Sequence, residues 1–226
     1  MNSWVQAGVR MSNFDWVVVG CGGHGKEVAA LVETFLLTGD TRILGWLDDN
    51  EAKWDSTVAG LQVLGGLDWI ARHGQPLNVA VAIGSCTHRE MIVNRIKGLG
   101  AEVQFPVLRH PGANIGPRVT LGEGALIQAG CILTCDIEVG PFAVLNIGVT
   151  LSHDAKVGPF SSLHPGVRLA GGASVGHGAE LGMGTHVIPL GHVGDRARTG
   201  ALAAVVRDVA PQTTSVGVPA RPLVKK

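Results

Sequence analysis

The chain of 226 residues contains no tyrosine, and aromatic residues make up only 4% of it. It has no excess of charge, because 18 Lys and Arg residues balance 18 Asp and Glu residues. A balanced charge gives no support for a surface that binds nucleic acid. No apolar run approaches the roughly 20 residues that a membrane-spanning helix needs, and the N-terminus lacks a signal-peptide pattern. The sequence therefore predicts neither a nucleic-acid-binding protein nor membrane insertion.

Cysteine pairs with a recognisable spacing are also missing. The four cysteines are Cys21, Cys86, Cys131 and Cys135. They form no C-x-x-C motif and no disulfide framework, so we expect reduced thiols in a cytoplasmic protein. His177, His186 and His192 do not repeat the spacing of metal ligands, and we interpret them as surface or interface residues. No metal site is predicted.

Glycine is abundant, with 33 residues, and an aliphatic residue occupies every sixth position from Ile115 to Val193. The positions are Ile115, Leu121, Ile127, Leu133, Val139, Leu145, Leu151, Val157, Leu163, Leu169, Val175, Leu181, Val187 and Val193. A period of six fits neither a helix nor a simple strand, and hexapeptide repeats are typical of β-helices. Three hexads should form one triangular coil of 18 residues.

A column of glycines supports the 18-residue coil. Its members are Gly122, Gly140, Gly158, Gly176 and Gly194. We expect each of them to occupy a stacked corner that requires a permissive backbone. The β-helix is predicted over residues 111–210, followed by a tail, residues 211–226, that caps the open end and prevents pairing with another edge.

Strands and helices alternate before the repeat, which predicts a small Rossmann-like parallel α/β domain over residues 14–110. The predicted strands are 15–20, 43–47, 78–83 and 102–108, and the predicted helices are 26–37, 67–73 and 87–99. Residues 1–13 are expected to be a disordered extension.

A glycine-rich turn from Gly20 to Gly25 lies between the first strand and the first helix and fits the G-x-G-x-x-G pattern of dinucleotide sites. A nicotinamide dehydrogenase is disfavoured, because the rest of the chain is a solenoid and offers no second catalytic domain. Backbone amides at a helix N-terminus would still suit a phosphate or a carboxylate. The alternative is a tight turn that binds no ligand.

Five motifs taken together resemble a known family. They are the G-x-G-G-H-G-K turn, Leu-Asp-Asp after the second strand, Ala-Ile-Gly before a helix, N-x-G-x-x-L-x-H-D inside the hexads, and a terminal G-x-P-A. They are similar to the bacterial hexapeptide-repeat sugar acetyltransferases, which include perosamine and bacillosamine-pathway N-acetyltransferases and sialic acid O-acetyltransferases. The resemblance spans nearly the whole chain after residue 13. It implies a left-handed β-helix, a homotrimer with active sites between subunits, and acetyl-CoA bound in the groove between adjacent β-helices.

The resemblance also implies the residues of the site. His153 would be the catalytic base, with Asp154 as its partner. The sugar substrate would contact Gly22, Gly23, His24, Asp48, Asp49, Gly84 and Asn146. Acetyl-CoA would contact Ser162, His164, Met183 and Ala201. Some relatives carry a histidine at the position of Ser162, so either Ser162 or His164 remains a candidate for contacting the thioester.

Acetyl transfer from a thioester needs a positioned nucleophile and an acceptor for its proton, and histidine suits that role near neutral pH. Asp154 could accept a ring N–H of His153 and fix its tautomer. A polar turn residue without catalytic function is the alternative for His153. Cys135 lies 18 residues before His153, which raises a Cys-His acyl-enzyme as a second route; a packed thiol is the alternative for Cys135.

These observations predict an acetyl-CoA-dependent N-acetyltransferase that acts on the amino group of a nucleotide-activated amino sugar of the 4-amino-deoxy type. O-acetylation of a sialic acid or a related sugar hydroxyl is the alternative within the enzyme class, because the same base serves an amine and a hydroxyl. A non-catalytic trimer that uses the β-helix only for assembly is the alternative outside it.

Overall fold

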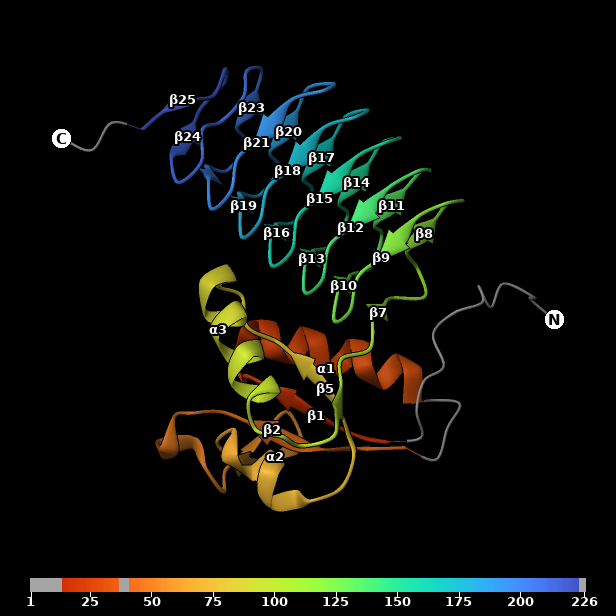
Figure 1. Ribbon diagram of the computed structural model, residues 1–226, viewed down its shortest axis with the longest axis vertical. Coiled ribbons are helices and arrows are strands. Elements are labelled where there is room, and N and C mark those ends of the chain that lie inside the picture. Colours follow the sequence, from red (N-terminus) through yellow and green to blue (C-terminus); the bar gives the residue numbers. More distant parts are fainter. Residues whose placement is uncertain (1–13, 37–40, 224–226) are drawn as a thin grey trace.

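The computed structural model describes residues 14–36 and 41–223, and the extension predicted for residues 1–13 lies outside them. The described chain forms two parts, an α/β domain and a long β-helix that lies across it (Figure 1). Among the described residues, no helix is long and apolar enough to cross a membrane.

The α/β domain is built on a six-stranded sheet with the strand order β3-β4-β2-β1-β5-β6. Its elements are β1 (Asp15–Val19), α1 (Gly23–Leu36), β2 (Ile43–Leu47), η1 (Glu51–Lys53), β3 (Thr57–Val58), β4 (Leu61–Gly65), α2 (Asp68–His73), β5 (Leu77–Val81), α3 (Cys86–Lys97) and β6 (Val103–Gln104). All pairs are parallel except β3 with β4. The predicted alternation of strand and helix is confirmed, whereas the β3–β4 hairpin was not predicted; its first strand, β3, has only two residues.

The core of this domain lies on both faces of the central strands. All five residues of β5 are buried, as expected for a parallel strand covered on both sides. Trp16 and Trp46 are buried with Val28 and Val32 of α1 on one face. Ile92 and Ile96 of α3 pack on the other face. The helices therefore hold the carboxyl ends of β1, β2 and β5 together at one edge of the sheet.

The β-helix has three parallel sheets of very short strands. The first sheet contains β7 (Leu108–Arg109), β10 (Leu126–Ile127), β13 (Val144–Leu145), β16 (Ser162–Leu163), β19 (Glu180–Leu181), β22 (Arg198–Thr199), β24 (Thr214–Val216) and β25 (Arg221–Pro222). The second contains β8 (Asn114–Ile115), β11 (Ile132–Leu133), β14 (Thr150–Leu151), β17 (Arg168–Leu169), β20 (His186–Val187) and β23 (Ala204–Val205). The third contains β9 (Thr120–Leu121), β12 (Glu138–Val139), β15 (Lys156–Val157), β18 (Ser174–Val175) and β21 (His192–Val193).

The register of the strands confirms the 18-residue coil. Ile127 pairs with Leu145, and Leu133 pairs with Leu151, so each residue lies beside the one 18 positions later. The aliphatic column points into the prism, where Ile127, Leu133 and Leu145 are fully buried. Each coil therefore adds its own layer to one apolar core that continues through the stacked coils.

The chain turns at three corners in each coil, and several corner residues adopt the left-handed conformation. Among them are Asp136, Phe142, Asp154 and Phe160, with φ of 56°, 55°, 61° and 56°. The glycine column has a different cause from the one predicted. Gly122 is not among the residues with positive φ; instead, a Cβ on it would collide with the backbone nitrogen of Pro141 in the next coil. Close stacking of coils, not a special φ, requires these glycines.

The ends of the β-helix differ from the prediction. The predicted strand 102–108 is wrong, because it divides into β6 of the α/β domain and β7, which pairs with β10. The first β-helix strand therefore begins before residue 111. In the tail, Arg198 pairs with Thr214, only 16 residues later, and β25 runs antiparallel to β24.

The first sheet faces the α/β domain. Leu108, Leu126 and Val144 on its outer side belong to the same buried cluster as α1. Phe142 and Phe160, at the corners that lead into this sheet, stack on each other with ring centroids 5.1 Å apart and extend the cluster that contains α3. Both helices therefore rest on the β-helix, and the two parts share buried apolar surface.

Candidate active site

His153 and Asp154 lie together at a corner between the second and third sheets. The Nδ1 atom of His153 is 2.8 Å from Oδ2 of Asp154, and both side chains are about two-thirds exposed, at 66% and 65%. The left-handed conformation of Asp154, which aspartate tolerates well, turns the chain at this point. With Nδ1 engaged by the carboxylate, Nε2 is the ring nitrogen that remains for a reacting group.

This corner lies across the prism from the α/β domain. A triangular coil has three faces, and the α/β domain packs against the first sheet. The corner of His153 joins the second and third sheets, so it is the corner opposite that face. Within one chain, His153 therefore points away from the residues predicted to bind the sugar.

The predicted sugar-binding residues of the α/β domain gather at the carboxyl edge of its sheet. Gly22, Gly23 and Gly84 lie there, beyond the ends of β1 and β5. This is where the strand order reverses, because β2 and β5 lie on opposite sides of β1. Ligands of open α/β sheets bind in the crevice at such a point.

Asp48 fixes the glycine-rich turn to the end of β2. Its Oδ2 accepts hydrogen bonds from the backbone N–H and the thiol of Cys21, at 3.2 and 3.0 Å, and from Nζ of Lys53, at 3.0 Å. Its Oδ1 accepts one from the N–H of Asn50. Burial acts to raise the pKa of Asp48, but these hydrogen bonds outweigh it and lower the pKa to about 2. Asp48 is thus an anchor of the turn.

Asp49 is more accessible than Asp48, with 47% of its side chain exposed, and it pairs with Arg95 at 2.6 Å. Both aspartates line a small cleft of about 190 Å³ at the end of the sheet. Its other walls are mostly apolar and come from Val19, Gly20, Leu47, Leu67, Ile83, His88 and Ile92. An apolar cleft with a few polar groups at its rim is typical of small-molecule sites.

His24 lies in the first turn of α1. Its Nδ1 is 3.3 Å from Oε2 of Glu27, while its Nε2 is buried and has no hydrogen-bond partner among the described residues. Burial is the main cause that lowers the pKa of His24, and the charges of Arg89 and His164 lower it further. The buried Nε2 of His24 is therefore held in an environment that disfavours the charged ring.

Four of the other predicted residues lie at one series of stacked corners. Asn146, His164, Met183 and Ala201 all lie at corners that lead from the first sheet to the second. Met183 is 59% exposed, and Nε2 of His164 is 3.1 Å from Glu180. The strand β14 separates Asn146 from His153, so one chain does not bring these two side chains to one corner.

Ser162, which was predicted to contact acetyl-CoA in the groove, is buried at the junction of the two parts. Only 2% of it is exposed, and its hydroxyl accepts a hydrogen bond from Nη2 of Arg89 at 2.9 Å. The thiol of Cys86 is 3.3 Å away. Because α3 covers Ser162, its side chain is enclosed in the domain junction, and His164 is the more accessible of the two thioester candidates.

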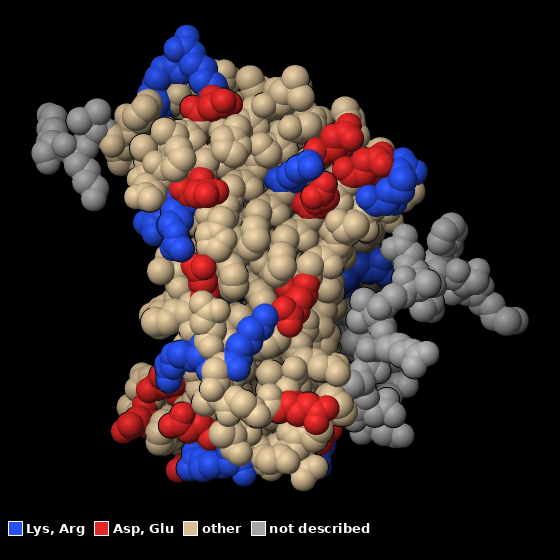
Figure 2. Space-filling model, in the orientation of Figure 1, with Lys and Arg blue, Asp and Glu red and all other residues tan. Residues whose placement is uncertain are grey.

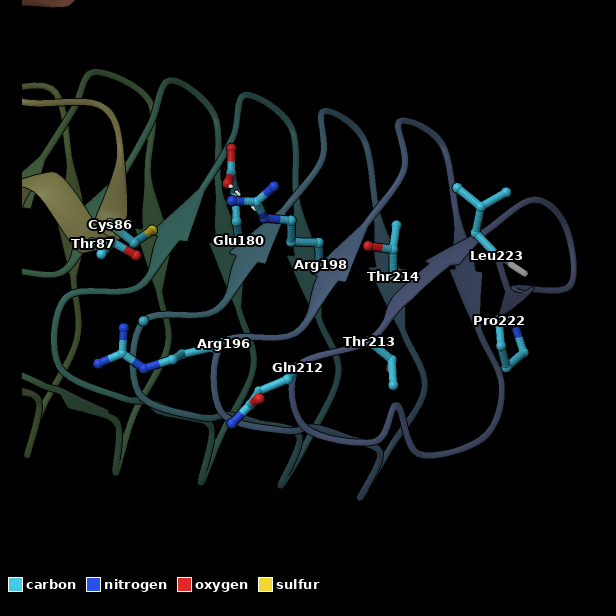
Figure 3. Close-up of a pocket in the computed structure, with 11 residues that line it drawn as sticks. Cys86, Thr87, Glu180, Arg196, Arg198, Gln212, Thr213, Thr214, Pro222 and Leu223 are labelled. Atoms are coloured by element: carbon cyan, nitrogen blue, oxygen red, sulfur yellow. Dashed lines mark ion pairs between the residues drawn. The ribbon is translucent and has the colours of Figure 1, made fainter. Parts of the chain in front are cut away.

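A larger, polar cavity of about 620 Å³ opens beside α3, where the α/β domain leaves the first sheet uncovered (Figure 3). Figure 3 shows Glu180 and Arg198 paired on adjacent strands, with Cys86 and Thr87 at the start of α3. On the face of the molecule shown in Figure 2, acidic and basic side chains are interspersed and form no continuous patch of one sign.

The surroundings of Cys135 do not favour its thiolate form. A hydrogen bond with Asp136 is the main cause that raises the pKa of the Cys135 thiol. A raised pKa keeps the thiol protonated near neutral pH, and the thiolate is the reactive form. No group of three or more potential metal ligands occurs among the described residues.

Arg89 is the residue that sequence reasoning missed. It is 1% exposed, and no pattern marked it. Its guanidinium donates to the backbone oxygens of Ile83, Phe142 and Phe160 at 2.6, 2.9 and 2.7 Å. A basic residue near the start of an amphipathic helix gives no signal in the sequence that it is buried.

Comparison with known proteins agrees with this architecture. Residues 15–96 match the family model described as the PglD N-terminal domain. Among curated proteins, none matches the chain.

Solved structures match over nearly the full length. PerB from Caulobacter crescentus, in complex with CoA and GDP-perosamine, is 31% identical, covers 93% of this chain and 97% of its own, and superposes with a TM-score of 0.83. A histidine-to-asparagine variant of perosamine N-acetyltransferase from the same organism, with the same two ligands, is 30% identical over the same shares, with a TM-score of 0.85. The acetyltransferase domain of PglB from Neisseria gonorrhoeae, in complex with acetyl coenzyme A, is 28% identical, covers 94% of this chain and all of its own, 100%, with a TM-score of 0.84.

The identity and the coverage together establish the family. The predicted fold, a parallel α/β domain followed by a hexapeptide β-helix, and the predicted use of acetyl-CoA are confirmed. The chain belongs to the PglD-like hexapeptide-repeat sugar N-acetyltransferases and is a sugar acetyltransferase that uses acetyl-CoA.

Proposed function

We propose that the enzyme transfers the acetyl group of acetyl-CoA to the amino group of a nucleotide-activated 4-amino-deoxy sugar, with His153 as the general base. The observation that carries this proposal is the pair of His153 and Asp154, in which the carboxylate engages Nδ1 and leaves Nε2 for a reacting group. The perosamine N-acetyltransferase that the chain resembles binds GDP-perosamine, which supports an amino-sugar nucleotide as the substrate class.

The transfer would be direct. The neutral amine nitrogen attacks the thioester carbonyl carbon, and Nε2 of His153 accepts a proton from that nitrogen. The tetrahedral intermediate then collapses, the carbon–sulfur bond breaks, and the imidazolium returns the proton to the CoA sulfur. Asp154 holds the ring in the required tautomer and stabilises the imidazolium. A covalent route through Cys135 is disfavoured by the raised pKa of its thiol.

The two substrates would bind on different parts. The nucleobase would occupy the apolar cleft beside Asp48 and Asp49, and the sugar would pass the turns at Gly22, Gly23 and Gly84 near His24. Acetyl-CoA would lie along the corners that carry Asn146, His164, Met183 and Ala201. Acetyl-CoA and nucleotide sugars are both cytoplasmic metabolites, and we place the enzyme in that compartment.

A homotrimer completes the site in this proposal. His153 points away from the α/β domain of its own chain, so the base must meet a sugar held by another copy. Exposed apolar side chains surround the second sheet and would be covered by the neighbouring copies; they include Ile132, Ile147, Ile188, Leu190 and Leu202. Closed cyclic assembly is the common arrangement for such head-to-tail contacts.

Release of free CoA thiol tests the proposal. Wild-type enzyme and His153→Ala are incubated with acetyl-CoA and a panel of amino-sugar nucleotides, and free sialic acids serve as hydroxyl acceptors. We expect turnover with a 4-amino sugar nucleotide that the variant loses, while its affinity for acetyl-CoA is kept. Turnover with sialic acid alone would mean that the acceptor is a hydroxyl group and not an amine. A His153→Ala variant with the wild-type rate would mean that His153 is not the general base.

A further inference from the structure

Arg89 of α3 is enclosed at the junction between the α/β domain and the β-helix. Only 1% of its surface is exposed, and burial lowers the pKa of its guanidinium. A buried charge is costly unless hydrogen bonds replace the water that it loses. Arg89 has such a set of partners, and most of them are backbone carbonyl groups.

The partners of Arg89 lie on both sides of the junction. On the α/β side, Nη1 donates to the carbonyl oxygens of Ile83 and Gly84, at 2.6 and 3.2 Å. These residues form the turn between β5 and α3. On the β-helix side, Nε donates to the carbonyl of Phe142 at 2.9 Å, and Nη2 donates to the carbonyl of Phe160 at 2.7 Å.

The corners that receive Arg89 have a defined shape. Phe142 and Phe160 occupy equivalent corners of adjacent coils, and both are in the left-handed conformation. Their rings stack, and Phe105 packs edge-on against Phe142, with ring centroids 5.2 Å apart. The guanidinium thus spans two coils, and a planar fork of five donors is suited to several fixed acceptors at once.

We propose that Arg89 is a positioning residue that fixes the turn at Ile83 and Gly84 against the β-helix and so sets where a bound sugar nucleotide meets the acetyl group. This inference rests on the proposed function, in which Gly84 contacts the sugar. Because only 1% of Arg89 is exposed, it would act through the groups that it holds and not by contacting a substrate. Without the Arg89 side chain, each substrate could still bind to its own part of the molecule. Only the alignment of the two bound substrates would be disturbed.

Kinetics of Arg89→Met test the alignment. Methionine keeps an unbranched apolar chain and removes every donor. Arg196→Met is the matched control, because Arg196 also joins the β-helix to α3, through a partly exposed ion pair with Glu90 at 2.9 Å. We expect kcat of Arg89→Met to fall on the order of 100-fold, as a small misplacement of reactants can cause. The dissociation constant for acetyl-CoA should stay at the wild-type value, so that the loss appears in kcat alone.

A folded Arg89→Met enzyme with wild-type kcat would overturn the proposal. If the methionine variant does not fold, Arg89→Lys replaces it, since lysine keeps the charge but cannot reach all acceptors; a wild-type kcat there would equally overturn the proposal.

A distance measurement separates this inference from the proposed function. Spin labels are placed on Ala71→Cys in α2 and Lys156→Cys in β15, in a Cys135→Ser background, and labelled chains are diluted with unlabelled ones. We expect one narrow distance distribution for the parent and a broader one for Arg89→Met. Identical distributions would overturn the proposal, whereas a parent enzyme without acetyl transfer but with the expected distances would overturn only the function.

Discussion

The ring of His153 lies directly against the backbone of Gly171, one coil further along. A Cβ added at Gly171 would be 2.5 Å from Nε2 of His153 and 2.6 Å from Cε1. The N–H of Gly172 also donates to the carbonyl of His153, at 2.9 Å. The position of the His153 ring therefore requires a residue without a side chain at Gly171 in the next coil.

Gly171→Ala is expected to displace the imidazole and lower kcat on the order of 100-fold, because a general base must stay within hydrogen-bond reach of its proton. The coils should remain folded, since the ring is exposed and can swing outward. Steady-state kinetics and circular dichroism measure the two effects. Gly98→Ala is the control, with only ordinary contacts around its Cβ at 3.4 Å. A Gly171→Ala enzyme as fast as the wild type would contradict the placement of His153.

Asp154→Asn is expected to lower kcat while leaving acetyl-CoA binding unchanged, because the amide no longer favours the charged imidazolium. Asp136 provides a matched control, since it occupies the equivalent corner one coil earlier and has a similar φ, but it pairs with Arg118. Asp136→Asn should keep kcat near the wild-type value. Equal losses in the two variants would mean that the corner, and not the contact with His153, matters.

Asp48→Asn is expected to destabilise the protein by about 2 kcal/mol at pH 7, since the pKa falls from 3.8 to about 2 on folding. A depressed carboxyl pKa stabilises the fold above the unfolded pKa, and this contribution is lost as pH falls through the folded pKa. The difference between wild type and variant should therefore shrink between about pH 4 and pH 2. Urea unfolding at several pH values measures it. Asp49→Asn, with an exposed partner, should change stability by less than about 1 kcal/mol.

Mixing two inactive variants tests whether sites form between subunits. His153→Ala removes the base, and Gly22→Glu places a carboxylate in the glycine-rich turn, where a Cβ meets no atom within 4 Å. Refolding the two together should restore about a quarter of the sites, because random assembly pairs an intact base with an intact neighbouring turn at that frequency. A mixture without activity, from variants that do assemble, would place the whole site within one chain.

The hexad repeat allowed the β-helix to be predicted because each buried position depends only on residues 18 apart, such as Leu133 and Leu151. The pair of His153 and Asp154 was suggested by the motif that the chain shares with the sugar acetyltransferases, and their contact needs no distant partner because the two residues are adjacent in the chain. The surroundings of Ser162 and Arg89 were not predictable. Ser162 lies on an outer face like other strand positions, and only the docking of α3 buries it. On the β-helix side, the partners of Arg89 are main-chain carbonyl groups 53 and 71 residues away. Every residue has such a carbonyl group, so the sequence does not indicate which of them accept hydrogen bonds.

The buried tryptophans of the α/β domain have a spectroscopic consequence. All five tryptophans of the chain precede residue 70, and they include Trp16 and Trp46 in the core beneath α1. The ring N–H of Trp54 donates to the backbone oxygen of Asp48, beside the small cleft. Intrinsic tryptophan fluorescence therefore reports on the part of the chain before the β-helix. The β-helix contains no tryptophan, so binding of a nucleotide sugar can be followed by this fluorescence while acetyl-CoA is bound to the β-helix.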